Sequence, residues 1–81
     1  MKIVLSDRAA DAIADASEPV QKAFHKQLRF LASNLNHPSL RAKKYDVTND
    51  AWQARVNRDW RFYFVIRDDI YFITDVIPHP K

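Results

Sequence analysis

Two arginines, Arg55 and Arg61, lie in neighbouring strand-like runs, 52–56 and 60–67. Within each run apolar and polar residues alternate, so both arginines are expected on the polar face of one sheet. A guanidinium group stays charged at physiological pH, and its planar donors match the oxygens of a phosphate. Together with Arg67 and Tyr63 on the same face, these residues predict a surface that binds phosphate groups.

A surface that binds phosphate groups could also cleave its ligand if the ligand is RNA, because the ribose 2′-OH can act as the nucleophile. Such cleavage needs a base for the hydroxyl, cations for the pentavalent phosphate and an acid for the leaving oxygen. Arginine suits the second of these tasks. An imidazole such as that of His79 can exchange a proton near neutral pH, and tyrosine rings can stack on bases.

The composition restricts the class of protein. The chain has 81 residues and a hydrophobic fraction of 47%, which predict one small folded domain, 1–81. Its formal charge of +3 favours an anionic partner such as RNA or DNA. The absence of glycine excludes the glycine-rich loops that hold nucleotide phosphates. The absence of cysteine excludes disulfides and thiolate zinc sites and favours the cytoplasm. The apolar run at 2–6 is too short for a signal peptide or a membrane span.

No cofactor is expected, and no metal site is predicted. The three histidines, His25, His37 and His79, have no spacing typical of metal ligands. The first two are expected on a helix surface and in a loop.

Two helices are predicted after a short strand at 2–5. Ser6 or Asp7 caps the first helix, 7–16, and its inward residues are expected to be Ala9, Ala10 and Ile13. A second helix starts after Ser17 and ends before Pro38. Its apolar stripe recurs at helical spacing and comprises Val20, Phe24, Leu28, Leu31 and Leu35. The opposite face carries Lys22, His25, Lys26, Arg29 and Ser33, which form either a solvated surface or a surface for an acidic partner.

A polar connection at 37–50 is expected to lead into three antiparallel strands, 52–56, 60–67 and 70–77. Asp68 and Asp69 form the second turn. With Phe64 opposite Ala54 across a three-residue loop, the apolar side chains share one face. They are Trp52, Ala54, Val56, Phe62, Phe64, Ile66, Tyr71, Ile73 and Ile77. This register also puts Asp75 on the apolar face, where nothing in the sequence accounts for it; a bulge could move it. The fold class is α+β: a short N-terminal strand, an αα-hairpin and a three-stranded antiparallel sheet.

The order of these elements and the run from Arg55 to Phe64, RVNRDWRFYF, resemble the RelE/ParE superfamily of bacterial toxin–antitoxin modules. Members commonly show an arginine, a small turn, a second arginine and an aromatic-rich strand, followed by a charged turn and a tail with a histidine. Here Asp68-Asp69 matches the turn, and His79 matches the tail. The resemblance covers nearly the whole chain and implies the RelE/ParE-like fold.

RelE-like members are metal-independent endoribonucleases that cleave messenger RNA, many of them on the ribosome, and a cognate antitoxin holds them inactive. The resemblance implies that Arg61 stabilises the phosphate, with Arg55 supporting it, and that His79 exchanges the proton. Lys43 and Lys44 match the family's lysines only by approximate position. The implied catalytic set is Arg61, His79, Arg55, Lys43 and Lys44, and the implied substrate contacts are Tyr63, Lys81 and Tyr45.

The tail departs from the RelE pattern, in which arginine follows the histidine and a functional tyrosine comes last. Here Pro80 follows His79, and Lys81 is the last residue. Two alternatives to the ribonuclease therefore stay open. One is a ParE-like, non-catalytic inhibitor of DNA gyrase. The other is a decayed toxin that survives as an antitoxin-binding module.

Overall fold

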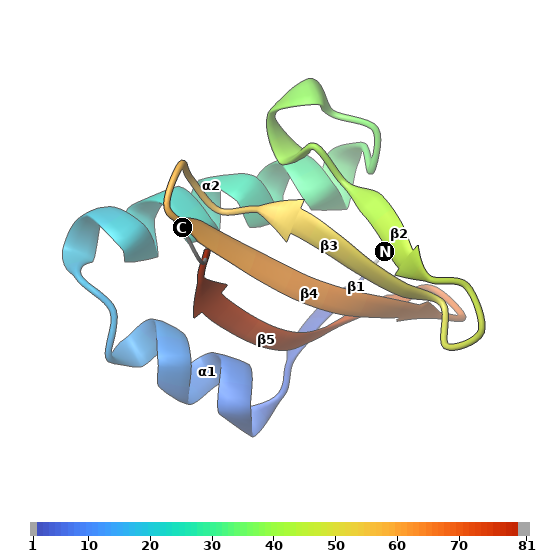
Figure 1. The fold of residues 1–81 in the computed structure, drawn as a ribbon, viewed down its shortest axis with the longest axis horizontal. Helices are drawn as coiled ribbons and strands as arrows, with labels where there is room; N and C mark the ends of the chain where they lie inside the picture. The colour runs from blue at the N-terminus through green and yellow to red at the C-terminus, as the bar shows by residue number, and fades with distance from the viewer. Residues whose placement is uncertain (1, 80–81) are drawn as a thin grey trace.

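A computed structural model describes residues 2–79. The chain forms one five-stranded sheet with two helices packed on it, and the strand order is β1-β5-β4-β3-β2 (Figure 1). In chain order the elements are β1 (Lys2–Leu5), α1 (Asp7–Ala14), α2 (Glu18–Ser33), the 3-10 helix η1 (Pro38–Leu40), β2 (Lys43–Asp46), β3 (Ala51–Arg55), β4 (Trp60–Arg67) and β5 (Ile70–Pro78). The α+β class is confirmed, but the prediction of a three-stranded sheet is wrong.

The two additional strands lie at the edges of the sheet. β1 runs parallel to β5, with Lys2 opposite Ile70, and β2 runs antiparallel to β3, with Lys43 opposite Gln53. β2 falls inside the stretch 37–50 that was expected to be a connection. Three of its four residues are exposed, so its sequence lacks the alternation that identifies a half-buried strand.

Both helices cover the same face of the sheet, and in Figure 1 α2 passes behind it. Ser6 caps α1, because its side-chain oxygen accepts a hydrogen bond from the Ala9 amide at 3.0 Å. Ala9 and Ile13 are buried as predicted. Ala10 is exposed, so its expected inward position is wrong; it is one position from Ala9, about 100° around the helix.

The apolar stripe of α2 forms one side of the core. Val20, Phe24 and Leu31 are buried, and Phe24 packs edge to face on Phe62 of β4 at 5.7 Å between ring centres. The helix ends at Ser33, so Leu35 lies beyond it and packs against the core from the following turn. No helix in residues 2–79 is long and apolar enough to cross a membrane.

The faces of β3 and β4 were predicted correctly although the register between them was not. Ala54 pairs with Phe62, and Trp52 pairs with Phe64, so the predicted pairing of Ala54 with Phe64 is wrong by two residues. A slip of two positions preserves which face each side chain occupies. Arg55 and Arg61 therefore still lie on the face opposite the helices, as expected.

One bulge in β5 changes the face of its last residues. Tyr63 pairs with Asp75 while Phe64 pairs with Ile73, which leaves Thr74 as the extra residue. Beyond this point Val76 is buried and Ile77 is 37% exposed, so the predicted inward position of Ile77 is wrong. The same shift moves Asp75 off the apolar face.

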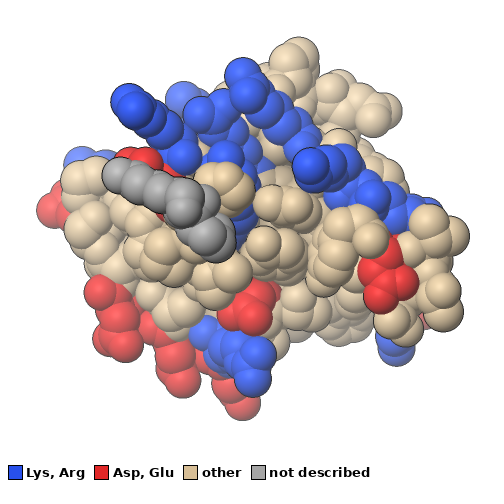
Figure 2. Space-filling view, viewed as in Figure 1, with Lys and Arg blue, Asp and Glu red and all other residues tan. Residues whose placement is uncertain are grey.

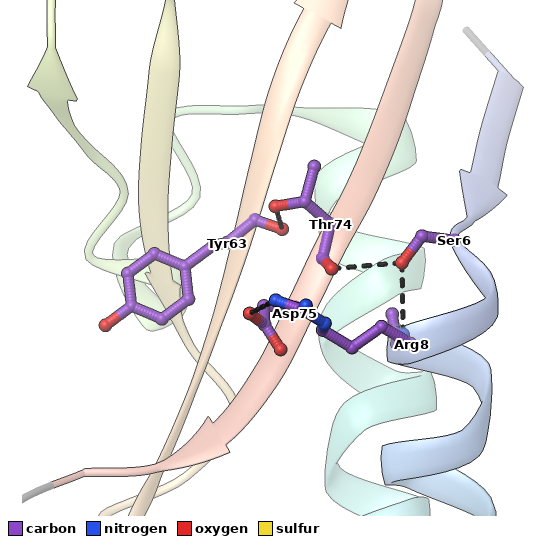
Figure 3. A network of polar contacts seen from close by, with 6 residues as sticks. Ser6, Arg8, Tyr63, Thr74 and Asp75 are labelled. Carbon is purple, nitrogen blue, oxygen red and sulfur yellow. Dashed lines mark hydrogen bonds and ion pairs between the residues drawn. The ribbon is translucent and has the colours of Figure 1, made fainter.

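Side chains from neighbouring elements hold this bulge (Figure 3). The Ser6 hydroxyl donates to the Thr74 carbonyl at 3.0 Å, and the Thr74 hydroxyl donates to the Tyr63 carbonyl at 3.2 Å. Arg8 lies 3.5 Å from the Asp75 carboxylate. The two hydroxyl groups give partners to backbone carbonyls that the interrupted ladder would otherwise leave unpaired.

Candidate functional site

The open face of the sheet contains a hollow of about 320 Å³, which lies where β3 ends and β4 begins. Its lining residues are Arg41, Lys43, Gln53, Ala54, Arg55, Arg61 and His79. The structure thus brings together four of the five residues predicted to be catalytic. They come from β2, β3, β4 and the segment after β5, so the pairing of several strands is needed to bring them together.

Arg55 and Arg61 form a directly opposed cross-strand pair. Two like charges in such a pair repel each other, and a set of backbone acceptors offsets this repulsion. The Asn57 carbonyl accepts from Arg55 Nε at 3.2 Å and from Arg61 Nη1 at 2.8 Å, and the Trp60 carbonyl accepts from Arg61 Nη1 at 2.9 Å. The turn between β3 and β4 therefore fixes both guanidinium groups.

The side chain of Asn57 in turn shapes this turn. Its Oδ1 accepts from the amides of Asp59 and Trp60, each at 2.9 Å. The Asp59 carbonyl then accepts from the backbone amide of His79 at 2.7 Å, which ties the segment after β5 to the same turn. One turn thus positions both arginines and the histidine.

Replacing Asn57 with alanine is expected to destabilise the protein by about 1 kcal/mol, because two turn amides lose their acceptor. Urea unfolding of the variant and of the wild type measures this difference. Asn34→Ala serves as the control, since Asn34 accepts a single exposed bond, from the Asn36 amide. Equal stability of Asn57→Ala and the wild type would show that the turn forms without this side chain.

The hollow is strongly electropositive. No acidic residue is among those that line it, whereas Arg41, Lys43, Arg55 and Arg61 all are. Lysine and arginine gather over α2, β3 and β2 in the upper part of Figure 2, and acidic side chains gather mainly around α1 along its lower edge. Such a separation of charge attracts and orients an anionic ligand.

Lys44, the fifth predicted catalytic residue, lies away from the hollow. It pairs with Trp52, on the apolar side of the sheet, and its ammonium lies 5.4 Å from the centre of that ring. Its Nζ is 2.9 Å from Asp50 Oδ1, and this hydrogen bond lowers the pKa of the Asp50 carboxyl. Its partner therefore offsets the charge of Lys44, whereas Lys43 faces the hollow.

The two tyrosines predicted to contact substrate lie beside the hollow without lining it. Tyr45 and Tyr63 pack edge to face, with ring centres 5.5 Å apart, and Tyr45 is 56% exposed. Tyr63 is half-buried and supports the exposed ring of Tyr45, and an exposed ring next to a cationic hollow is suited to stacking on a base. Lys81, the third predicted contact, lies outside the described residues.

Two residues near the site were missed in the sequence. Arg41 lies in the stretch predicted to be a polar connection, where no role was predicted for it; it follows η1 and has a φ of 47°, a backbone conformation unfavourable for a residue with a side chain. Gln27 is buried within the apolar surface of α2, where its Nε2 donates to the Arg55 carbonyl at 2.8 Å and to the Ser39 carbonyl at 3.0 Å. The signal for Gln27 was a polar residue between Phe24 and Leu31, at the spacing of the buried stripe.

No protein-family model and no curated protein matches the sequence. Solved structures do match the fold. A YoeB/ParE toxin from Agrobacterium tumefaciens is 12% identical over 99% of this chain and 100% of its own, with a TM-score of 0.82. RelE in the RelE-RelB complex from Pyrococcus horikoshii is 16% identical over 95% and 92% of the two chains, with a TM-score of 0.81.

The E. coli RelBE toxin–antitoxin complex also contains a similar chain, which is 13% identical over 99% of this chain and 98% of its own, with a TM-score of 0.77. At these identities the agreement concerns the path of the backbone along nearly the whole chain. The resemblance seen in the sequence is thereby confirmed at the level of structure: the chain has the fold shared by the RelE, YoeB and ParE toxins.

Proposed function

We propose that this protein is the toxin of a type II toxin–antitoxin module and that it cleaves messenger RNA. The observation that carries the proposal is the convergence of Arg55, Arg61, Lys43 and His79 on one open hollow without an acidic neighbour among its lining residues. A cationic cluster with one proton-exchanging group suits the cleavage of a phosphodiester. The toxin fold supports the same assignment.

The proposed reaction uses the RNA's own 2′-oxygen. This oxygen attacks the adjacent phosphorus, so that a bond from phosphorus to O2′ forms while the bond to O5′ breaks. Arg61 and Arg55 stabilise the charge on the pentavalent phosphate, and Lys43 adds a third cation. His79 delivers a proton to the departing O5′, and the 2′-OH proton passes to solvent. The products are a 2′,3′-cyclic phosphate and a 5′-hydroxyl end.

The proposed setting is the cytoplasm, with messenger RNA on the ribosome as substrate. A cognate antitoxin is the proposed regulator, since solved chains with this fold come from complexes with the antitoxins RelB and YefM. An acidic antitoxin would complement the cationic surface of Figure 2. Occupying the hollow would block access of RNA to Arg61.

Primer extension on a reporter transcript after brief induction in bacteria tests the proposal. New cuts inside the coding region are the expected result, with 5′-hydroxyl ends that a polynucleotide kinase labels without prior removal of a phosphate. Intact transcripts in growth-arrested cells would contradict it and favour the gyrase inhibitor, for which DNA supercoiling is the next measurement. Unimpaired growth would favour a decayed toxin that only binds its antitoxin.

A further inference from the structure

A second and larger hollow, of about 620 Å³, adjoins the site on the side of α2. Its cationic lining residues are Lys22, Lys26, Arg41, Arg55 and Arg58, and no acidic residue among residues 2–79 lines it. We call it the α2 groove. Arg41 and Arg55 line both the α2 groove and the hollow at the site, so the two depressions adjoin each other at these two cations.

We propose that the α2 groove binds the sugar–phosphate backbone of the single-stranded RNA next to the phosphate being cleaved. This inference rests on the proposed ribonuclease function, because it extends the bound strand beyond the reacting phosphate. A bound RNA whose reacting phosphate lies between Arg55 and Arg61 would continue past Arg55 into the α2 groove. The next phosphates then meet Lys26 and Arg58.

The other lining residues indicate which part of the RNA the groove contacts. The apolar walls come from Ala23, Pro38 and Val56, and no aromatic side chain lines the groove. Stacking on a base is provided mainly by aromatic rings, whereas an aliphatic wall beside lysine and arginine suits ribose and phosphate. The α2 groove therefore contributes affinity without base preference, and the exposed ring of Tyr45 lies elsewhere, beside the hollow at the site.

The groove is also held in shape. Gln27 at its base bonds to the Ser39 and Arg55 carbonyls, and it accepts from the Ser39 hydroxyl at 3.1 Å. These bonds join α2, η1 and β3. Lys22 pairs with Glu18 at 3.2 Å across one helical turn, and an exposed pair of this kind is readily exchanged for a phosphate contact.

Fluorescence polarisation with a labelled, fully 2′-O-methylated RNA of about twelve nucleotides tests the inference. This RNA lacks the nucleophile, so binding is measured without cleavage. Lys26→Ala and Arg58→Ala are each expected to weaken binding roughly threefold to tenfold, and to reduce the dependence of log affinity on log salt by about 0.7, the value for one lost phosphate contact. Oligo-U and oligo-A should show equal losses.

Arg29→Ala is the matched control, because Arg29 is an exposed cation of the same helix that does not line the groove. Unchanged binding by Arg29→Ala supports the assignment. An equal loss in Arg29→Ala, no loss in Lys26→Ala and Arg58→Ala, or no RNA binding by the wild type overturns it. Binding of a poly-glutamate peptide that depends on Lys26 and Arg58, without RNA binding, would also overturn it and assign the groove to an acidic protein partner.

The same variants separate this inference from the proposed function. Groove-dependent RNA binding by a protein that produces no cuts in cells would contradict the ribonuclease and leave the groove as an RNA-binding site. Cuts that persist unchanged in Lys26→Ala and Arg58→Ala, together with unchanged binding, would contradict the groove and leave the ribonuclease intact.

Discussion

Replacement of Arg61 with alanine is expected to lower the rate of transcript cleavage by about 10²- to 10³-fold and to restore growth. The carbonyls of the β3–β4 turn hold the Arg61 guanidinium in place before substrate arrives. A group fixed in advance stabilises the developing charge of the transition state without having to reorganise. The measurement is primer extension on a reporter transcript, with the fraction cut followed over time after induction.

Arg67→Ala is the matched control, because Arg67 lies on the same strand and face as Arg61 but at the opposite end, beside the Asp68-Asp69 turn. It should cleave like the wild type. Arg61→Lys should recover only part of the rate, since lysine retains the charge and loses the planar pair of donors. An Arg61→Ala protein that still cuts at the wild-type rate would remove Arg61 from the mechanism. One that restores growth with unchanged cutting would show that cleavage is not the toxic activity.

The alternation of apolar and polar residues predicted the faces of β3 and β4. It decides which side chains of a strand share a face, even when the predicted pairing between strands is shifted by two residues. Arg55 and Arg61 were therefore placed correctly even though the predicted register was two residues off. Alternation fails where the ladder is interrupted. Thr74 is a bulge residue whose partners, Ser6 and Tyr63, are far from it in sequence. The charge of Asp75 on the predicted apolar face was the local sign of a bulge, but it did not show where the bulge lies or that Ile77 changes face with it.

The prediction of the site residues also succeeded where alternation along a strand decides the face, and it also failed where contacts between distant parts of the sequence decide the structure. Lys43 and Lys44 are indistinguishable by type and position in a stretch interpreted as a loop. They point to opposite faces once β2 pairs with β3, and only Lys43 reaches the hollow. Arg41 lies in the site because it follows directly after η1. Two hydrogen bonds between Gln27 and Ser39 hold this short helix in place, and Gln27 lies on α2, an earlier part of the sequence. Long-range contacts of this kind leave no periodic signal.

Gln27→Leu is expected to reduce the free energy of unfolding by about 2–4 kcal/mol, although leucine suits the apolar surroundings. Gln27 is only 4% exposed, and its amide donates to two backbone carbonyls while accepting from the Ser39 hydroxyl. Leucine would leave the carbonyls of Arg55 and Ser39 without this donor in a partly buried position, and an unsatisfied buried group costs about 1–3 kcal/mol. Urea unfolding followed by circular dichroism measures the loss.

Gln21→Leu is the control from the same helix, because Gln21 also bonds to backbone carbonyls, those of Ile13 and Ala14, at 2.9 and 3.3 Å. Those bonds hold α1 and do not reach the sheet, so Gln21→Leu should leave cleavage per folded molecule unchanged. Gln27→Leu should lower it, because the Gln27 amide holds the backbone of Arg55 in place. Wild-type stability of Gln27→Leu would show that water replaces the amide. A loss of stability without any loss of cleavage would show that Gln27 holds the helix to the sheet without positioning Arg55.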